Sequence, residues 1–203
     1  MAYSKFTSLY KFCKQYHLQQ NTLTDLLDGI ILPSFSASER LTDDLQEAQR
    51  FPLYTEKAKS ELLIFPVLKE LKRKNDFISV FSGFSLNIEG ETDLTGNPDF
   101  ILSANPNIVE VQAPIFCLME SKNKTPDEGF AQCAAEMYAA KLFNIERETP
   151  QETIYGAVTN AYDWVFLRLT GDCISIDIKR YYLSDLNKLL GILQYIVNQY
   201  KPQ

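Results

Sequence analysis

The sequence is poor in the residues that build metal sites from sulfur and imidazole. Its 203 residues include four cysteines and one histidine, and no two cysteines are spaced as Cys-x-x-Cys. A structural zinc site needs four such ligands close together, so a zinc module is excluded. Scattered cysteines without a disulfide framework indicate reduced thiols, and we expect a cytoplasmic protein in which Cys117 is a small buried hydrophobic residue.

Long apolar runs and glycine-rich loops are also missing. No apolar run reaches the roughly 20 residues that are needed to span a bilayer, and residues 1–12 lack the apolar core of a signal peptide. We therefore expect no contact with a membrane. No glycine-rich phosphate loop follows a predicted strand, which disfavours a doubly wound nucleotide-binding fold.

Positive charge is in deficit, since 20 Lys and Arg residues face 26 Asp and Glu residues and give a formal net charge of −6. Affinity for duplex nucleic acid comes largely from neutralised phosphates, so a strongly basic coating protein is excluded. A nuclease is not excluded, because a metal site concentrates carboxylates and a local basic patch can coexist with a negative total. The candidate basic patch consists of Lys69, Lys72, Arg73 and Lys74. These residues either form a solvated helix face or contact the DNA backbone.

The predicted elements follow the order helices, strands, helix, strands, helix. Apolar spacing predicts helices over residues 3–16, 22–32, 54–74, 127–144 and 183–200, and a short helix that starts at Ser38. Short apolar runs between turn residues predict strands over 76–83, 84–89, 96–102, 114–119, 153–159, 164–169 and 173–178. The sequence therefore predicts one α/β domain with a mixed sheet flanked by helices. Residues 1–52 are a helical extension, residues 53–203 are the core, and helix 127–144 is a strand–helix–strand crossover.

Two of the predicted strands carry the polar residues that are candidates for metal binding and catalysis. Asp99 lies in the first apolar run, and Glu120, Ser121 and Lys122 end the second. Side chains alternate between faces along a strand, so Glu120 and Lys122 point to the same side, and Asp99 joins them if the strands pair. Two carboxylates with one ammonium suit a hard divalent cation bound through oxygen. The lysine can orient a water or stabilise charge that develops on a reacting phosphate.

Two predicted helices carry further polar candidates. Glu61 lies inside the apolar stripe of helix 54–74, where a carboxylate is costly to bury unless it is paired or meets a metal. The alternative is a surface glutamate at the edge of the stripe. Gln132 and Glu136 are i,i+4 neighbours on one face of helix 127–144. That face either looks toward Glu120 and Lys122 or forms a polar helix edge. Pro66 predicts a kink over residues 62–66.

Pro98-Asp99, a spacer of twenty residues and then Glu120-Ser121-Lys122 together resemble the signature of the PD-(D/E)XK nuclease superfamily. The resemblance covers roughly residues 55–198 and leaves out the N-terminal segment. It implies a restriction-endonuclease-like fold. Members of the superfamily often carry a glutamate on the first core helix and a glutamine on the second, at the places of Glu61 and Gln132 here.

The resemblance implies a metal-dependent nuclease that hydrolyses phosphodiester bonds by direct in-line attack, with DNA as the expected polymer. It implies that Mg²⁺, or Mn²⁺ in its place, is bound by Asp99, Glu120, Glu61 and the backbone carbonyl of Ser121. Lys122 would then position the attacking water.

Many nucleases of this kind are dimers, so a homodimer through residues 183–200 or through the N-terminal helix is also expected. One alternative is a non-catalytic module of the same fold that binds protein or nucleic acid. Another is an unrelated α/β domain in which these residues only form ion pairs.

Overall fold

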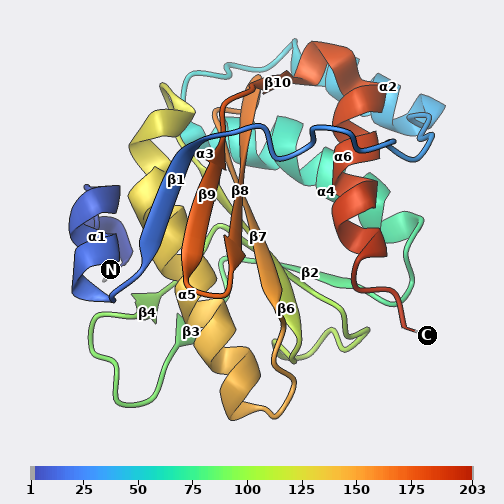
Figure 1. The fold of residues 1–203 in the computed structure, drawn as a ribbon. Helices are drawn as coiled ribbons and strands as arrows, with labels where there is room; N and C mark the ends of the chain where they lie inside the picture. Colours follow the sequence, from blue (N-terminus) through green and yellow to red (C-terminus); the bar gives the residue numbers. More distant parts are fainter. Residues whose placement is uncertain (1–2, 203) are drawn as a thin grey trace.

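The computed structural model describes residues 3–202 and shows an eight-stranded mixed sheet with helices on both faces (Figure 1). The strands of this sheet are β1 Gln19–Thr24, β2 Ser79–Ser82, β5 Phe100–Ser103, β6 Ile115–Ser121, β7 Thr153–Thr159, β8 Asp163–Thr170, β9 Cys173–Asp177 and β10 Tyr181–Tyr182. Their order is β1-β9-β8-β7-β6-β5-β2, with β10 paired to β8. Only the pairs β1·β9 and β6·β7 are parallel among the described strands. The predicted mixed α/β sheet is therefore confirmed. Strands β3 Leu86–Asn87 and β4 Thr95–Gly96 form a separate small sheet.

The helices cover the sheet in two layers (Figure 1). One face packs against α1 Leu9–Gln15 and α5 Phe130–Glu146. The other face packs against α2 Glu39–Ala48, α4 Phe65–Arg73 and α6 Leu186–Asn198, while α3 Glu56–Lys59 leads into α4. Short 3-10 turns occupy Tyr3–Lys5, Pro126–Gly129 and Leu183–Asp185. None of the helices in residues 3–202 has the combined length and apolar character that crossing a bilayer requires.

Strand β6 lies inside the sheet and is buried along its whole length. All seven of its residues are buried, Cys117 among them as expected, and it lies between antiparallel β5 and parallel β7. Helix α5 makes the predicted crossover from β6 to β7. The helix can approach closely because Gly156 of β7 has no side chain: a Cβ there would lie 2.5 Å from Met137 Sδ and 2.8 Å from Cys133 Sγ. The polar face of α5 is thereby held close to the end of β6.

The N-terminal segment differs from the prediction of a purely helical extension over residues 1–52, of which residues 1 and 2 lie outside the described range. The helix expected over residues 22–32 is wrong, because Gln19–Thr24 forms β1, which pairs in parallel with β9. The side chains of β1 are almost all exposed. A strand at the edge of a sheet with exposed side chains has no apolar alternation, so the hydrophobic pattern could not reveal it.

The long helix expected over residues 54–74 is present with its interruption. Helix α3 passes through a π-helical turn, Ser60–Ile64, into α4, and Phe65 N donates to Ser60 O. Pro66 lies in the first residues of α4, and the wide turn just before it absorbs the missing N–H. A π-helical turn takes more residues than an α-helical one. The regular spacing of 3.6 residues per turn therefore does not hold across this turn. A prediction that assumes this spacing assigns some residues to the wrong face of the helix, and Glu61 is one of them.

The two helices expected to offer a dimer interface use their apolar faces inside the chain. Leu189, Leu190 and Leu193 of α6 are buried in the core that α6 shares with α4. Phe12 and Cys13 of α1 are buried in the core that α1 shares with α5. These apolar faces are therefore not available to a second copy.

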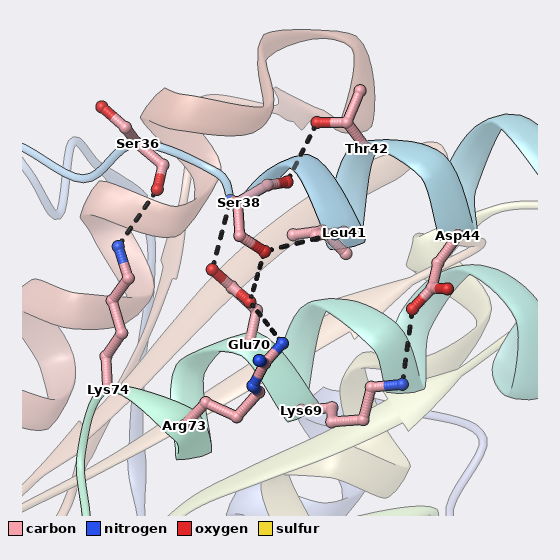
Figure 2. A network of polar contacts seen from close by, with 9 residues as sticks. All are labelled: Ser36, Ser38, Leu41, Thr42, Asp44, Lys69, Glu70, Arg73 and Lys74. Atoms are coloured by element: carbon pink, nitrogen blue, oxygen red, sulfur yellow. Dashed lines mark hydrogen bonds and ion pairs between the residues drawn. The ribbon is translucent and has the colours of Figure 1, made fainter.

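A polar network fastens α2 to α4 (Figure 2). The buried carboxylate of Glu70 accepts two hydrogen bonds from Ser38, from N to Oε1 at 3.2 Å and from Oγ to Oε2 at 3.0 Å. Ser38 is also the N-cap of α2, since its Oγ accepts from Leu41 N at 3.2 Å. Arg73 Nη1 lies 3.7 Å from Glu70 Oε2. One serine thus begins α2 and satisfies a carboxylate of α4.

We expect Ser38→Ala to lower the free energy of unfolding by about 1–3 kcal/mol, because it removes a helix cap and one partner of a buried carboxylate. Urea denaturation followed by circular dichroism measures the change. Ser36→Ala is the matched control, since Lys74 Nζ donates to the Ser36 backbone carbonyl at 3.1 Å and alanine retains that acceptor. Equal losses in the two variants would contradict the role of the Ser38 hydroxyl.

Candidate functional site

The carboxyl end of β6 and the start of β5 bring together the acidic and basic residues predicted from the sequence. Asp99 immediately precedes β5, Glu120 lies near the end of β6, and Lys122 follows it directly. The antiparallel register of β5 and β6 sets Asp99 beside the end of β6. Asp99 Oδ2 accepts a hydrogen bond from the backbone N of Ser121 at 2.7 Å. The strand pairing that was a condition of the sequence prediction is therefore present.

A chain of hydrogen bonds joins these strands to α5. Lys122 Nζ donates to Glu120 Oε1 at 2.5 Å and to Gln132 Oε1 at 3.0 Å. Gln132 Nε2 in turn donates to Glu136 Oε1 at 3.1 Å. Of the two alternatives for this face of α5, the structure shows the one in which it looks toward Glu120 and Lys122.

Burial shifts the proton affinities of the whole cluster. Desolvation, reinforced by the charge of Asp99, raises the pKa of Glu120 to about 7, and the charge of Lys122 opposes this rise. Desolvation and the charge of Glu120 raise the pKa of Glu136 well above its ordinary value. Desolvation opposes the charged form of Lys122, but the neighbouring Glu120 carboxylate raises the pKa of that ammonium. Burial thus favours the neutral form of Glu136, and the pairing with Glu120 favours the charged form of Lys122.

Asp99 belongs to the same electrostatic unit. Desolvation raises the pKa of its carboxyl group, while the hydrogen bond from the Ser121 backbone and the charge of Lys122 lower it. Three carboxyl groups thus share one ammonium. Such a cluster has a deficit of positive charge, which a cation could fill.

Two buried oxygens, Glu120 Oε2 and Glu136 Oε2, have no hydrogen-bond partner among the described residues. An unsatisfied buried polar atom costs about 1–3 kcal/mol, so each of these oxygens favours a ligand or a proton. Protonation meets this need at Glu136, whose pKa is strongly raised. The same proton can also be donated to Glu120, since a hydrogen bond between the two side chains contributes to the pKa of both, and a cation is the alternative partner for Glu120.

The chemistry of these donors fits a hard divalent cation. Asp99 and Glu120 offer carboxylate oxygens, and Ser121, which lies between Glu120 and Lys122 in the sequence, offers a backbone carbonyl. Mg²⁺ typically binds through one or two carboxylates and keeps several of its waters. Across residues 3–202, however, no group of three or more His, Cys, Asp or Glu side chains is arranged to hold a metal ion. The donors therefore fit a largely hydrated ion and not a closed cage of protein ligands.

Glu61 is not brought to this cluster. Its side chain is 63% exposed, and its ion pair, at 3.9 Å, is with Lys57 in the same helix. This position agrees with the alternative of a surface glutamate. The sequence pattern favoured Glu61 because a regular helical phase was followed across the π-helical turn Ser60–Ile64.

Glu56, in the first turn of α3, is the helix carboxylate that faces the cluster instead. Desolvation raises the pKa of Glu56, and the charge of Asp99 adds to this while Lys122 opposes it. A signal for its place was present in the sequence: Thr55 is the N-cap of α3, with Oγ1 accepting from Ala58 N at 3.1 Å. An acidic residue directly after a cap belongs to the first helical turn, at a helix end and not along its side.

The basic run at the end of α4 is engaged by the protein itself, and Figure 2 shows this for Lys69, Arg73 and Lys74. Lys69 pairs with Asp44 at 3.4 Å, Arg73 lies 3.7 Å from Glu70, and Lys72 and Lys74 donate to backbone carbonyls. The loop after β6 is held by other cations. Lys59 Nζ donates to Asn123 O at 2.6 Å, and Arg180 Nη2 pairs with Asp127 Oδ2 at 2.6 Å. Lys59 of α3 and Arg180, which follows β9, thus hold the segment that comes after the candidate site.

No protein-family model matches this chain, and no curated protein matches it in sequence.

The buried carboxyl of Glu136 predicts a particular dependence of stability on pH. Its pKa in the folded chain is well above the ordinary 4.5, so between these two values the folded state holds more protons than the unfolded state. The free energy of unfolding consequently falls as pH rises above about 4.5, and Glu120 contributes in the same direction up to about pH 7. Glu136→Gln keeps an acceptor for Gln132 and cannot ionise.

We expect Glu136→Gln to change the free energy of unfolding little at pH 5 and to raise it at pH 8 by at least about 1.4 kcal/mol, because each unit by which folding raises the pKa of Glu136 costs about that much once the unfolded carboxyl group has ionised. Urea titrations from pH 5 to 8 in the presence of EDTA measure this. The control is Glu146→Gln, at an exposed position on the same helix. A pH profile parallel to that of the unmodified protein would contradict the assignment.

Proposed function

We propose that this protein is a metal-dependent nuclease with a restriction-endonuclease-like fold, which hydrolyses phosphodiester bonds of nucleic acid, with DNA as the expected polymer. The observation that carries the proposal is the convergence of Asp99, Glu120 and Lys122 at the ends of adjacent strands. Their spacing resembles the PD-(D/E)XK signature. A mixed sheet with helices on both faces is compatible with that superfamily.

In this proposal Asp99, Glu120 and the backbone carbonyl of Ser121 hold a Mg²⁺ or Mn²⁺ ion, with Glu56 beside them. A divalent ion at such a site supplies Lewis-acid polarisation and lowers the pKa of bound water. Hydrolysis forms a bond from a water oxygen to phosphorus and breaks the bond to the leaving oxygen, while one proton leaves the water and one joins the leaving group.

The residues of the chain have distinct parts in this reaction. Lys122 keeps its proton because Glu120 raises its pKa, so it presents an ammonium where negative charge develops on the phosphate. Gln132 accepts one hydrogen bond from Lys122 and thereby fixes the direction of that ammonium. Gln132 is itself oriented by Glu136, which accepts from its amide nitrogen.

A non-catalytic module of the same fold is the second candidate function. The observation that favours it is the direct ion pair of Lys122 with Glu120, together with the lack of an acidic trio for a metal among the described residues. In such a module the cluster would stabilise the end of β6, and the protein would act by binding. Metal binding and cleavage separate this candidate from the nuclease.

We expect Lys122→Ala to lower the rate of cleavage by about a hundredfold or more and to leave metal binding in place, because an ammonium is not a metal ligand. Asp99→Ala is expected to abolish both. Calorimetric titration with Mg²⁺ and Mn²⁺ measures binding, and a panel of labelled DNA and RNA substrates measures cleavage. Lys14→Ala, at an exposed lysine on α1, controls for the loss of one positive charge. Unchanged cleavage by Lys122→Ala would refute its role.

The geometry also predicts which helix glutamate supports the metal. Glu56→Gln is expected to weaken Mg²⁺ binding by about tenfold or more, as loss of a group that tunes a metal ligand does. Glu61→Gln removes the same charge from an exposed side chain and is expected to have a much smaller effect. Calorimetry on the two variants gives the comparison directly. A larger effect at Glu61 would restore the sequence prediction and refute the placement of Glu56.

A further inference from the structure

The hairpin of β3 and β4 lies between β2 and β5, and its return strand leads to the candidate site. Its two strands pair Leu86 with Gly96. Where the hairpin joins the main sheet, Gly83 N donates to Asp99 O at 3.0 Å. Asp99 therefore lies at the neck of the hairpin, a few residues after Gly96. The position of the hairpin consequently bears on the position of the Asp99 carboxylate.

Tyr3 holds the hairpin next to this neck. It belongs to the N-terminal segment, residues 3–15, and its side chain is buried. Its hydroxyl donates to Leu86 O at 2.8 Å. Its ring lies against Gly96, where a Cβ would be 2.7 Å from Tyr3 Cδ2. Tyr3 thus contacts both strands of the hairpin, and the ring occupies room that only a glycine leaves.

Further contacts hold the loop between β3 and β4 to the same N-terminal segment (Figure 1). Asp93 of this loop pairs with Lys5 and accepts a hydrogen bond from Gln15 Nε2 at 3.2 Å. Ile88 and Leu94 are buried in the core that the hairpin shares with α1 and α5. The N-terminal segment therefore holds the hairpin both next to its neck and at its loop.

Tyr3 also lies close to the helix of the candidate site. The 3-10 turn Tyr3–Lys5 packs against α5. Burial raises the pKa of the Tyr3 phenol, and the charge of Glu136 adds to this rise. One short segment thus contacts the hairpin that leads to Asp99 and the helix that carries Gln132 and Glu136.

We propose that Tyr3 is a positioning residue for Asp99 and acts through the β3–β4 hairpin. With its ring against Gly96, the hairpin holds the neck where the Asp99 carboxylate meets Ser121 N at 2.7 Å. The inference rests on the proposed metal site, because a ligand that loses its support binds a metal less tightly. It adds to that site a residue outside the part of the chain that resembles the nuclease superfamily.

Amide hydrogen exchange, followed by NMR in EDTA, tests the position of Asp99 without a metal. Ser121 N donates to the Asp99 carboxylate, whereas the next amide, Lys122 N, donates to Thr159 O at 2.8 Å. We expect Tyr3→Leu to accelerate exchange at Ser121 by about tenfold, as loss of one hydrogen bond predicts, and to change Lys122 little. The reason is that only the bond to Asp99 depends on the hairpin. A general loss of stability would accelerate both amides alike.

Calorimetric titration with Mg²⁺ tests the consequence for the metal site. Tyr3→Leu is expected to weaken binding by about tenfold or more, as loss of a group that supports a ligand does. Tyr3→Phe keeps the ring against Gly96 and is expected to have a smaller effect. Phe12→Leu is the matched control, because Phe12 is equally buried in the same segment but its ring packs against Tyr16 and Tyr138. It is expected to leave both measurements nearly unchanged.

The outcomes separate this inference from the proposed function. Equal acceleration of the Ser121 and Lys122 amides in Tyr3→Leu, or the same selective effect in Phe12→Leu, overturns the positioning role. Unchanged Mg²⁺ affinity in Tyr3→Leu also overturns it where the unmodified protein binds the ion. Selective acceleration at Ser121 supports the role of Tyr3 even if the unmodified protein binds no Mg²⁺, a result that would refute the metal site alone.

Discussion

The ion pair between Glu120 and Lys122 is the interaction on which the candidate site depends. Glu120 lies near the end of a strand whose seven residues are all buried, so its carboxylate has almost no access to water. Removing one partner from a buried ion pair leaves the other charge uncompensated and typically costs about 3–5 kcal/mol. Lys122 therefore has a structural role in addition to its proposed catalytic role. Both roles depend on the burial of Glu120 in β6.

The approach of α5 to the sheet is the second constraint on this pair. Gly156 leaves room for Met137 and Cys133, and α5 can then bring Gln132 within hydrogen-bond distance of Lys122. The amide of Gln132 suits this place because it accepts from a cation and donates to a carboxyl group at the same time. The close contact of α5 with Gly156 thus determines both how the helix packs on the sheet and how the Lys122 ammonium is oriented.

Part of this arrangement was predictable from local patterns. Alternation along two turn-bounded apolar runs predicted that Glu120 and Lys122 share a face and that Asp99 can join them, and the alanine-rich helix predicted the crossover. Strand β1 was missed because exposed edge residues carry no apolar alternation. Glu56 was missed because a π-helical turn changes the phase that pointed to Glu61.

These features bear on how an acidic chain can bind a polyanion. With a net charge of −6 and the basic run of α4 committed to contacts such as Lys69 with Asp44, long-range attraction to nucleic acid is weak. Binding by the proposed nuclease then depends on the metal and on the ammonium of Lys122, which act at short range in the candidate site. Such binding makes the affinity less dependent on salt than that of a basic duplex-binding groove, where the release of counterions dominates.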